Sequence, residues 1–145
     1  MELETVALEF LMLADRAEVL NGKLYVMGGG YDRRTIDNMD VPLTLSMVVG
    51  VLVPWNLTNQ PHTIRLTLQT EDGTTVGQQV QGQLTVGRSA QAISGQMFRV
   101  MTVVNVTTPL PRLGAYRVIA TLDNGDSKAA TFYAVSSETP AKQAG

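Results

Sequence analysis

The sequence predicts an all-β protein, an antiparallel immunoglobulin-like β-sandwich of about eight strands. Two observations carry this prediction. Apolar and polar residues alternate with a period of two along most of the chain, and Asn-Gly pairs separate apolar runs at 21–22 and 124–125. The 145 residues suit one domain. We expect that domain to span residues 1–135 and the polar segment 136–145 to be a flexible tail.

The first apolar segment, residues 3–17, fits two patterns. Its apolar residues match a helical stripe and match a strand equally well. We favour the strand, because the Asn21-Gly22 turn must be entered from a strand.

A glycine triplet, Gly28–Gly30, follows that turn after a short apolar run. It marks a point where a strand ends, bulges or lets a neighbour approach its backbone. A phosphate loop with Arg33 and Arg34 as counter-charges is the disfavoured alternative, because such loops lead into a helix and this context is rich in strands.

The middle of the chain contains the clearest strand patterns. Every second residue from Leu43 to Val53 is apolar, and the opposite face of that strand is partly apolar as well. Residues 64–69 alternate strictly, as in a half-buried antiparallel strand. The Gln- and Gly-rich residues 76–86 predict a weak edge strand or two short strands.

Three further strands complete the prediction, at 98–106, at 116–122 and around 129–135. Asp123–Asp126 contains the second Asn-Gly pair and is expected to form the hairpin turn between the last two.

Two stretches resemble known families. The residues Leu113-Gly114-Ala115-Tyr116-Arg117-Val118 resemble the strand entry of immunoglobulin-like and fibronectin-type domains, in which a tyrosine hydroxyl bonds back to the loop backbone. The pattern Leu-Ala-Asp-x-Ala-x-Val from Leu13, followed by Asn-Gly-Lys-Leu-Tyr-Val-x-Gly-Gly-Gly-x-Asp-Arg from Asn21, looks like the opening of a bacterial and phage family of small β-sandwich domains of unknown function. That resemblance implies the fold and a bacterial or phage origin, but no activity.

Composition disfavours several classes of function. A net charge of −2 lacks the positive footprint of a nucleic-acid-binding protein, and there are no cysteines for thiol or disulfide chemistry. The acidic N-terminus is unlike a signal peptide, and no apolar run is long enough for a bilayer. We therefore expect a cytoplasmic protein or a virion component, with no membrane, nucleic acid or cofactor as partner.

Catalytic and metal-binding sets are poorly represented. His62 is the single histidine and is expected to lie partly exposed in a loop. The sequence contains no Gly-x-Ser-x-Gly turn that would present a serine nucleophile. We therefore predict no catalytic residues, no metal site and no enzymatic activity. Two alternatives stay open: a glycan-active enzyme using strand carboxylates such as Glu9 and Glu18, and calcium held where Asp37 and Asp40 converge with Asp123 and Asp126.

The remaining hypothesis is a protein interface. Tyr31, Arg33 and Arg34 follow the glycine triplet and Trp55 begins another loop, and these residue types anchor interfaces. We therefore expect a non-catalytic interaction or assembly module that binds a protein partner or itself, with a structural part of a bacterial or phage particle as the sharper variant.

Overall fold

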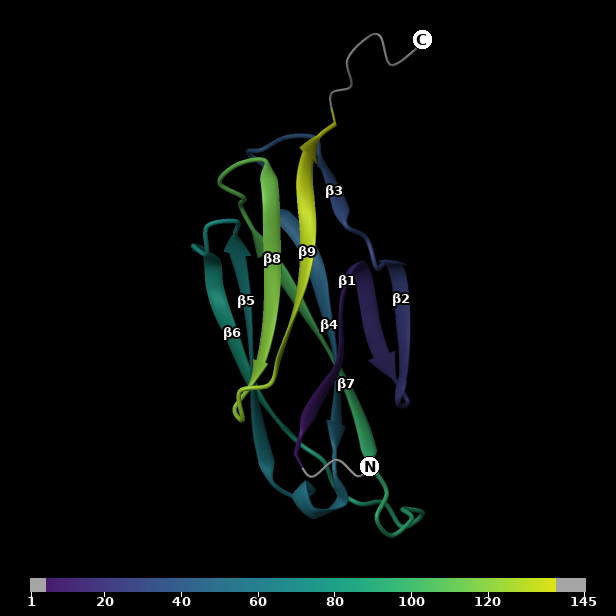
Figure 1. Ribbon diagram of the computed structural model, residues 1–145. Helices are drawn as coiled ribbons and strands as arrows, with labels where there is room; N and C mark the ends of the chain where they lie inside the picture. Colours follow the sequence, from purple (N-terminus) through teal and green to yellow (C-terminus); the bar gives the residue numbers. More distant parts are fainter. Residues whose placement is uncertain (1–4, 138–145) are drawn as a thin grey trace.

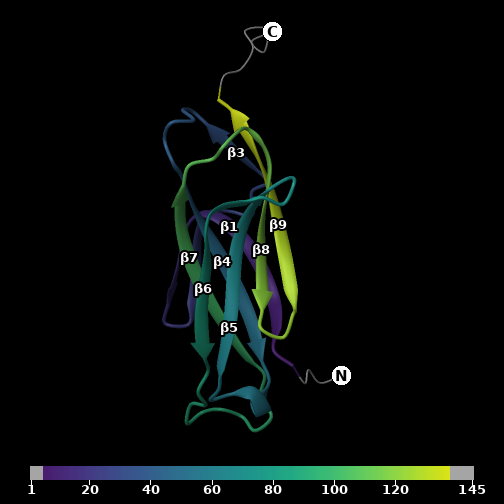
Figure 2. The ribbon, with the colours of Figure 1, turned by 90° about the vertical axis from the view of Figure 1, so that its left-hand side faces the viewer.

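The computed structural model describes residues 5–137 as nine strands arranged in two facing sheets (Figures 1 and 2). The four-stranded sheet has the order β2-β1-β4-β7, and the five-stranded sheet has the order β3-β9-β8-β5-β6. The strands are β1 (Ala7–Leu20), β2 (Lys23–Gly29), β3 (Arg33–Ile36), β4 (Leu43–Val53), β5 (Pro61–Thr70), β6 (Thr75–Thr85), β7 (Phe98–Thr108), β8 (Gly114–Leu122) and β9 (Ser127–Ser136). A short 3₁₀ turn, η1 (Trp55–Leu57), follows β4. The expected all-β sandwich is confirmed, and most of the expected tail lies outside the described residues.

The centre of the four-stranded sheet is β4, which pairs with β1 on one side and along its whole length with β7 on the other. Its alternate residues from Leu43 to Val53 are buried in the core, as predicted. The opposite face is covered too, because Val48 is fully buried and the ring of Phe10 lies over Gly50.

The five-stranded sheet supplies the other half of the core. Ile64, Leu66 and Leu68 are buried, which confirms the half-buried strand, and Val118 on β8 lies among them. At the outer edge, β6 is one strand rather than two, with Gly77 at a φ of 69° and a register irregularity in its pairing with β5.

Tyr116 ties the start of β8 to the preceding loop. Its hydroxyl donates to the Arg112 carbonyl at 2.5 Å and accepts from the Arg112 amide at 3.2 Å. The ring stacks on Phe132 of β9, with centroids 5.5 Å apart. This is the backbone tie that the resemblance to immunoglobulin-like domains implies.

From Ala7 onward the N-terminal apolar segment is a strand, which confirms the choice over a helix, while residues 3 and 4 lie outside the described residues. β1 pairs with β4 as far as Ala14. Beyond Ala14, as far as Leu20, β1 pairs with β2 alone. The residues from Asp15 to Gly29 therefore form a hairpin that leaves the sandwich, and we call it the projecting hairpin.

One strand was not expected from the sequence. After β2 the chain crosses from the four-stranded sheet to the five-stranded sheet. There β3 pairs in parallel with β9, and Arg33 lies opposite Tyr133. This parallel pair is the exception to the antiparallel pairing of the other strand pairs among the described residues. Residues 33–36 carry no apolar alternation, and their extended backbone depends on a partner strand far away in the sequence.

The β8–β9 connection is a hairpin, but it differs from the first Asn-Gly turn. Only Gly125 has a positive φ there, at 94°, and the Leu122 carbonyl accepts from the Gly125 amide. The turn holds the first strand in place. The Asn124 side chain donates to the Val6 carbonyl and Asp126 accepts from the Leu8 amide, both at 2.7 Å.

Candidate functional site

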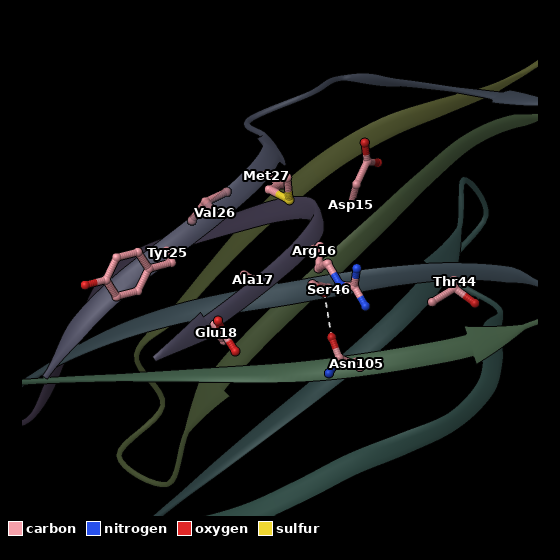
Figure 3. A pocket seen from close by; sticks show the side chains of 10 residues that line it. All are labelled: Asp15, Arg16, Ala17, Glu18, Tyr25, Val26, Met27, Thr44, Ser46 and Asn105. Carbon is pink, nitrogen blue, oxygen red and sulfur yellow. Dashed lines mark hydrogen bonds between the residues drawn. The ribbon is translucent and has the colours of Figure 1, made fainter. Parts of the chain in front are cut away.

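A concave surface opens where the projecting hairpin parts from β4 (Figure 3). β4 runs on toward Leu43 without a strand on that side, so a hollow of about 820 Å³ remains between the hairpin and the outer face of β4 and β7. Its lining residues are Asp15, Arg16, Ala17, Glu18, Tyr25, Val26, Met27, Thr44, Ser46 and Asn105.

The turn of the hairpin has the geometry that the Asn-Gly pair predicts. Asn21 and Gly22 have φ values of 51° and 73°, so both central residues are left-handed and the flanking strands keep their natural twist. Leu20 faces Lys23 across the turn, which sets the register of the remaining pairs.

The side chains of the hairpin are exposed to an unusual degree. Tyr25 is 52% exposed and Met27 is 68% exposed, and Leu20 and Val26 are exposed as well. Half of the large apolar side chains that are exposed within residues 5–137 lie in this short segment. Such clustering marks interaction surfaces, because an apolar patch in water is otherwise unfavourable.

The floor of the hollow is polar and ordered. Ser46, only 2% exposed, donates to Asn105 at 2.5 Å, and Thr44 bonds Thr107 at 2.9 Å across the same two strands. The hollow therefore combines a hairpin wall of apolar and charged side chains with a hydrogen-bonding floor.

The glycine triplet is a close approach within the hairpin. The Asp15 carboxylate occupies the space that a side chain at Gly28 would need, and Gly28 has a φ of 63°. The next element is β3 and not a helix, and a carboxylate at this position would repel a phosphate. The phosphate-loop alternative is therefore unsupported.

Tyr31 and Arg34 lie together. The Arg34 Nη1 donates to the Tyr31 hydroxyl at 3.0 Å, and Asp15 lies 3.8 Å from the same nitrogen. Tyr31 also packs edge-on against Phe132, and burial raises the pKa of its phenol while the bond from Arg34 opposes that shift. These contacts link β3 to the core and to β1, and Arg33 is left exposed.

Trp55 lies far from that cluster. β3 is at the top of Figure 1 and η1, which begins with Trp55, is at the bottom. The Trp55 ring stacks on Phe98, with centroids 6.0 Å apart, and the guanidinium of Arg88 lies over the Trp55 ring, 4.0 Å from its centroid. Arg88 also donates to the Trp55 carbonyl at 2.7 Å. The four predicted interface residues thus divide between two ends of the sandwich.

The acidic loops do not converge. Asp37 and Asp40 lie in the β3–β4 connection at the top of Figure 1, and Asp123 and Asp126 lie in the β8–β9 turn low in that view. Within residues 5–137, no three His, Cys, Asp or Glu side chains are placed to hold a metal ion. The geometry that the calcium alternative requires is absent from this part of the chain.

The strand carboxylates do not form a catalytic pair either. β1 bends back between Glu9 and Glu18 (Figures 1 and 3), so Glu9 lies on the part of β1 that pairs with β4 and Glu18 lies on the projecting hairpin. A glycosidase needs two carboxylates that face one substrate, and the Glu9 carboxylate is occupied by Arg99. His62, expected in an exposed loop, is instead buried at the start of β5 and bonds the Leu57 carbonyl at 2.8 Å.

Glu9 has a structural partner. Arg99 binds both of its carboxylate oxygens, at 2.5 and 2.6 Å, and these bonds lower the pKa of Glu9 below its ordinary value. A carboxyl group with a lowered pKa in the folded state stabilises that state above the pKa of the unfolded chain. This contribution is lost as the pH falls through the folded-state pKa.

We expect Glu9→Gln to be less stable than the parent at neutral pH and to show a flatter loss of stability between about pH 5 and pH 3. Urea unfolding at a series of pH values measures this. Arg99→Gln removes the same bonds and should flatten the curve equally. An unchanged slope in both variants would contradict the assignment.

Tyr25 and Met27 of the hairpin were not among the residues predicted from the sequence to form an interface. The available signal was the run Leu24–Met27, which is apolar on both strand faces directly after a tight turn. A strand buried on both faces carries the same pattern, so its exposure became evident only from the arrangement of its neighbours.

The model of a family described as a family of unknown function (DUF6941) matches residues 9–135. No curated protein and no solved structure gives a significant match. Within residues 5–137, no helix has the length and apolar character needed to cross a membrane.

Proposed function

The chain belongs to the DUF6941 family of unknown function, and from its surfaces we propose that it is a non-catalytic protein-interaction and assembly module whose docking element is the projecting hairpin. The exposure of Tyr25, Val26 and Met27 on this hairpin carries the proposal. Aromatic residues and methionine are enriched at interfaces because they bury a large area.

The hollow beside the hairpin gives a partner a place to bind. A polypeptide seated there would cover Tyr25 and Met27 on the hairpin wall and meet the hydroxyl and amide groups of Thr44 and Asn105. Such a site combines burial of apolar surface with a few polar contacts that orient the partner.

The sharper form of the proposal is a structural part of a bacterial or phage particle, located in the cytoplasm or in a virion. Only 17% of the residues are charged, compared with roughly 25% in an average soluble domain. A surface with few charges suits repeated contacts between subunits, because less charge must be desolvated on assembly.

Site-specific photo-crosslinking tests this proposal. A photoreactive phenylalanine analogue replaces Tyr25 in one variant of the full chain and Tyr133 in the control. Tyr133, on β9, is 51% exposed against 52% for Tyr25, so the two probes meet solvent equally.

In cells that produce the full chain, we expect the probe at position 25 to form covalent adducts with protein and the probe at position 133 to form several-fold fewer. Only the first probe lies in the proposed interface. Equal yields at both positions would contradict the proposal. A rise in melting temperature with calcium or oligosaccharides, without adducts at 25, would favour a ligand-binding sandwich.

A further inference from the structure

We propose that β2 pairs in antiparallel orientation with β2 of a second copy of this chain, centred on Val26, so that the two projecting hairpins become one four-stranded sheet of order β1-β2-β2-β1. This inference rests on the proposed function and names the partner at the free edge of the hairpin.

Of the four sheet edges among the described residues, β2 has the least protection, because its left-handed glycine, Gly28, lies near its end and leaves Lys23–Met27 regular. β3 has only four residues and begins with two arginines, and β6 contains a left-handed glycine and a register irregularity. Short length, charge and bulges all hinder pairing with another chain. β7 runs beside β6 of the other sheet in Figure 2, and its Thr102 and Val104 share a narrow hollow with Leu66, Val80 and Leu84.

β2 shows the opposite character. Its sequence from Lys23 to Met27 holds one charge, at the end next to the turn, and no proline. Leu20 and Lys23 flank a two-residue turn and form its closing pair, so Tyr25 and Met27 bond to β1 in the alternating pattern of an antiparallel ladder. Leu24 and Val26 therefore direct their backbone N–H and C=O groups toward the free edge.

The midpoint of β2 fixes the register with the longest overlap. A two-fold axis at Val26 gives the seven-residue strand its longest overlap with a second copy, and only Gly28, with its φ of 63°, departs from the regular pairing. This axis places Tyr25 beside Met27 of the second copy, and the symmetry repeats that contact. A thioether beside an aromatic ring is a favourable contact, and the two Val26 side chains face each other directly.

Charge selects the same register. Arg16 is opposite Met27 and Glu18 is opposite Tyr25 in the β1–β2 pair, so all four lie on one face. With the axis at Val26, the residues that lie side by side across the joined hairpins form a row of four. Each such row runs from Glu18 and Tyr25 of one copy to Met27 and Arg16 of the other. With the axis at Tyr25, Lys23 would lie opposite Met27 of the other copy and therefore in the row of Arg16, two strand spacings or about 10 Å away, so that these like charges repel.

The size of the contact sets its strength. A pair of seven-residue strands with two aromatic and two methionine side chains covers less than the ~1,600 Å² of a standard interface. We therefore expect a dimer that dissociates on dilution in the micromolar range.

Disulfide trapping reads the register directly, because the chain contains no cysteine. We expect Val26→Cys to form a disulfide-linked dimer in diamide at least ten times faster than Tyr133→Cys, which reports random collision of an exposed thiol. Leu24→Cys is the matched control on the same face of β2. In this register the two Leu24 positions lie four residues apart, about 13 Å, beyond the reach of a disulfide.

Sedimentation across concentration supplies the second measurement. Val26→Pro removes one outward N–H from the edge, and we expect it to raise the dimer dissociation constant at least tenfold while Val26→Ala stays near the parent. Circular dichroism checks that both variants keep the parent fold.

Trapping at Val26 no faster than at Tyr133, or fastest at Leu24, would overturn the inference. A heterologous adduct at position 25 in cells, together with no trapping at Val26, would overturn self-pairing and leave the proposed function standing. Absence of both would overturn the two together.

Discussion

Phe132→Ala is expected to lower the free energy of unfolding by about 3–5 kcal/mol, as measured by urea denaturation. The Phe132 side chain is completely buried and contacts two other rings, Tyr116 by stacking and Tyr31 edge-on at 6.3 Å. Its removal leaves a cavity between β8, β9 and the segment leading to β3. Since small domains have total stabilities of about 5–15 kcal/mol, the variant should approach the limit of folding.

The neighbouring residue provides the control. Tyr133 is half exposed on the same strand, and Tyr133→Ala should change stability by less than about 0.5 kcal/mol. Comparable losses in the two variants would show that the aromatic cluster does not carry the stability assigned to it.

Gly50→Val is expected to destabilise the fold by about 1–3 kcal/mol. A side chain at Gly50 would overlap the Phe10 ring, which lies flat over the outer face of β4. Gly82→Val is the matched control in a strand, since a Cβ there meets no atom within 4 Å, and its stability should stay near the parent's.

A second substitution distinguishes steric overlap from loss of glycine itself. Phe10→Ala removes the ring, so Gly50→Val should cost less in the Phe10→Ala background than in the parent, by about 1 kcal/mol or more. Simple additivity of the two effects would contradict the overlap.

The parts of the fold that depend on local pattern could be predicted from the sequence. The alternation from Leu43 to Val53, the left-handed turn at Asn21-Gly22 and the hydroxyl tie of Tyr116 all follow from neighbouring residues, and the structure contains each of them. β3 could not be predicted, because its pairing with β9 joins Arg33 to a residue one hundred positions away and residues 33–36 show no alternation of apolar and polar residues.

The candidate site shows the same division. Tyr31, Arg33, Arg34 and Trp55 were selected by residue type; all but Arg33, which is exposed, are engaged in side-chain contacts within the fold. The exposure of Tyr25 and Met27 depends on where β1 parts from β4, and that divergence is a property of the whole sheet. Residue type alone does not distinguish an aromatic side chain that supports the core from one that faces solvent.

The bonds from the β8–β9 turn to the first strand have a consequence for the time course of folding. The backbone groups of Val6 and Leu8 bond to residues 118 positions later in the chain. These two bonds are therefore among the last contacts to become possible during synthesis. At about 5–20 residues per second, the apolar face of β4 stays without its cover on the ribosome for several seconds until β8 has been made. A complete chain with such distant pairings should refold slowly, in milliseconds to seconds, and should refold best at low concentration. During synthesis, the chain should depend on chaperones until the second sheet has been made.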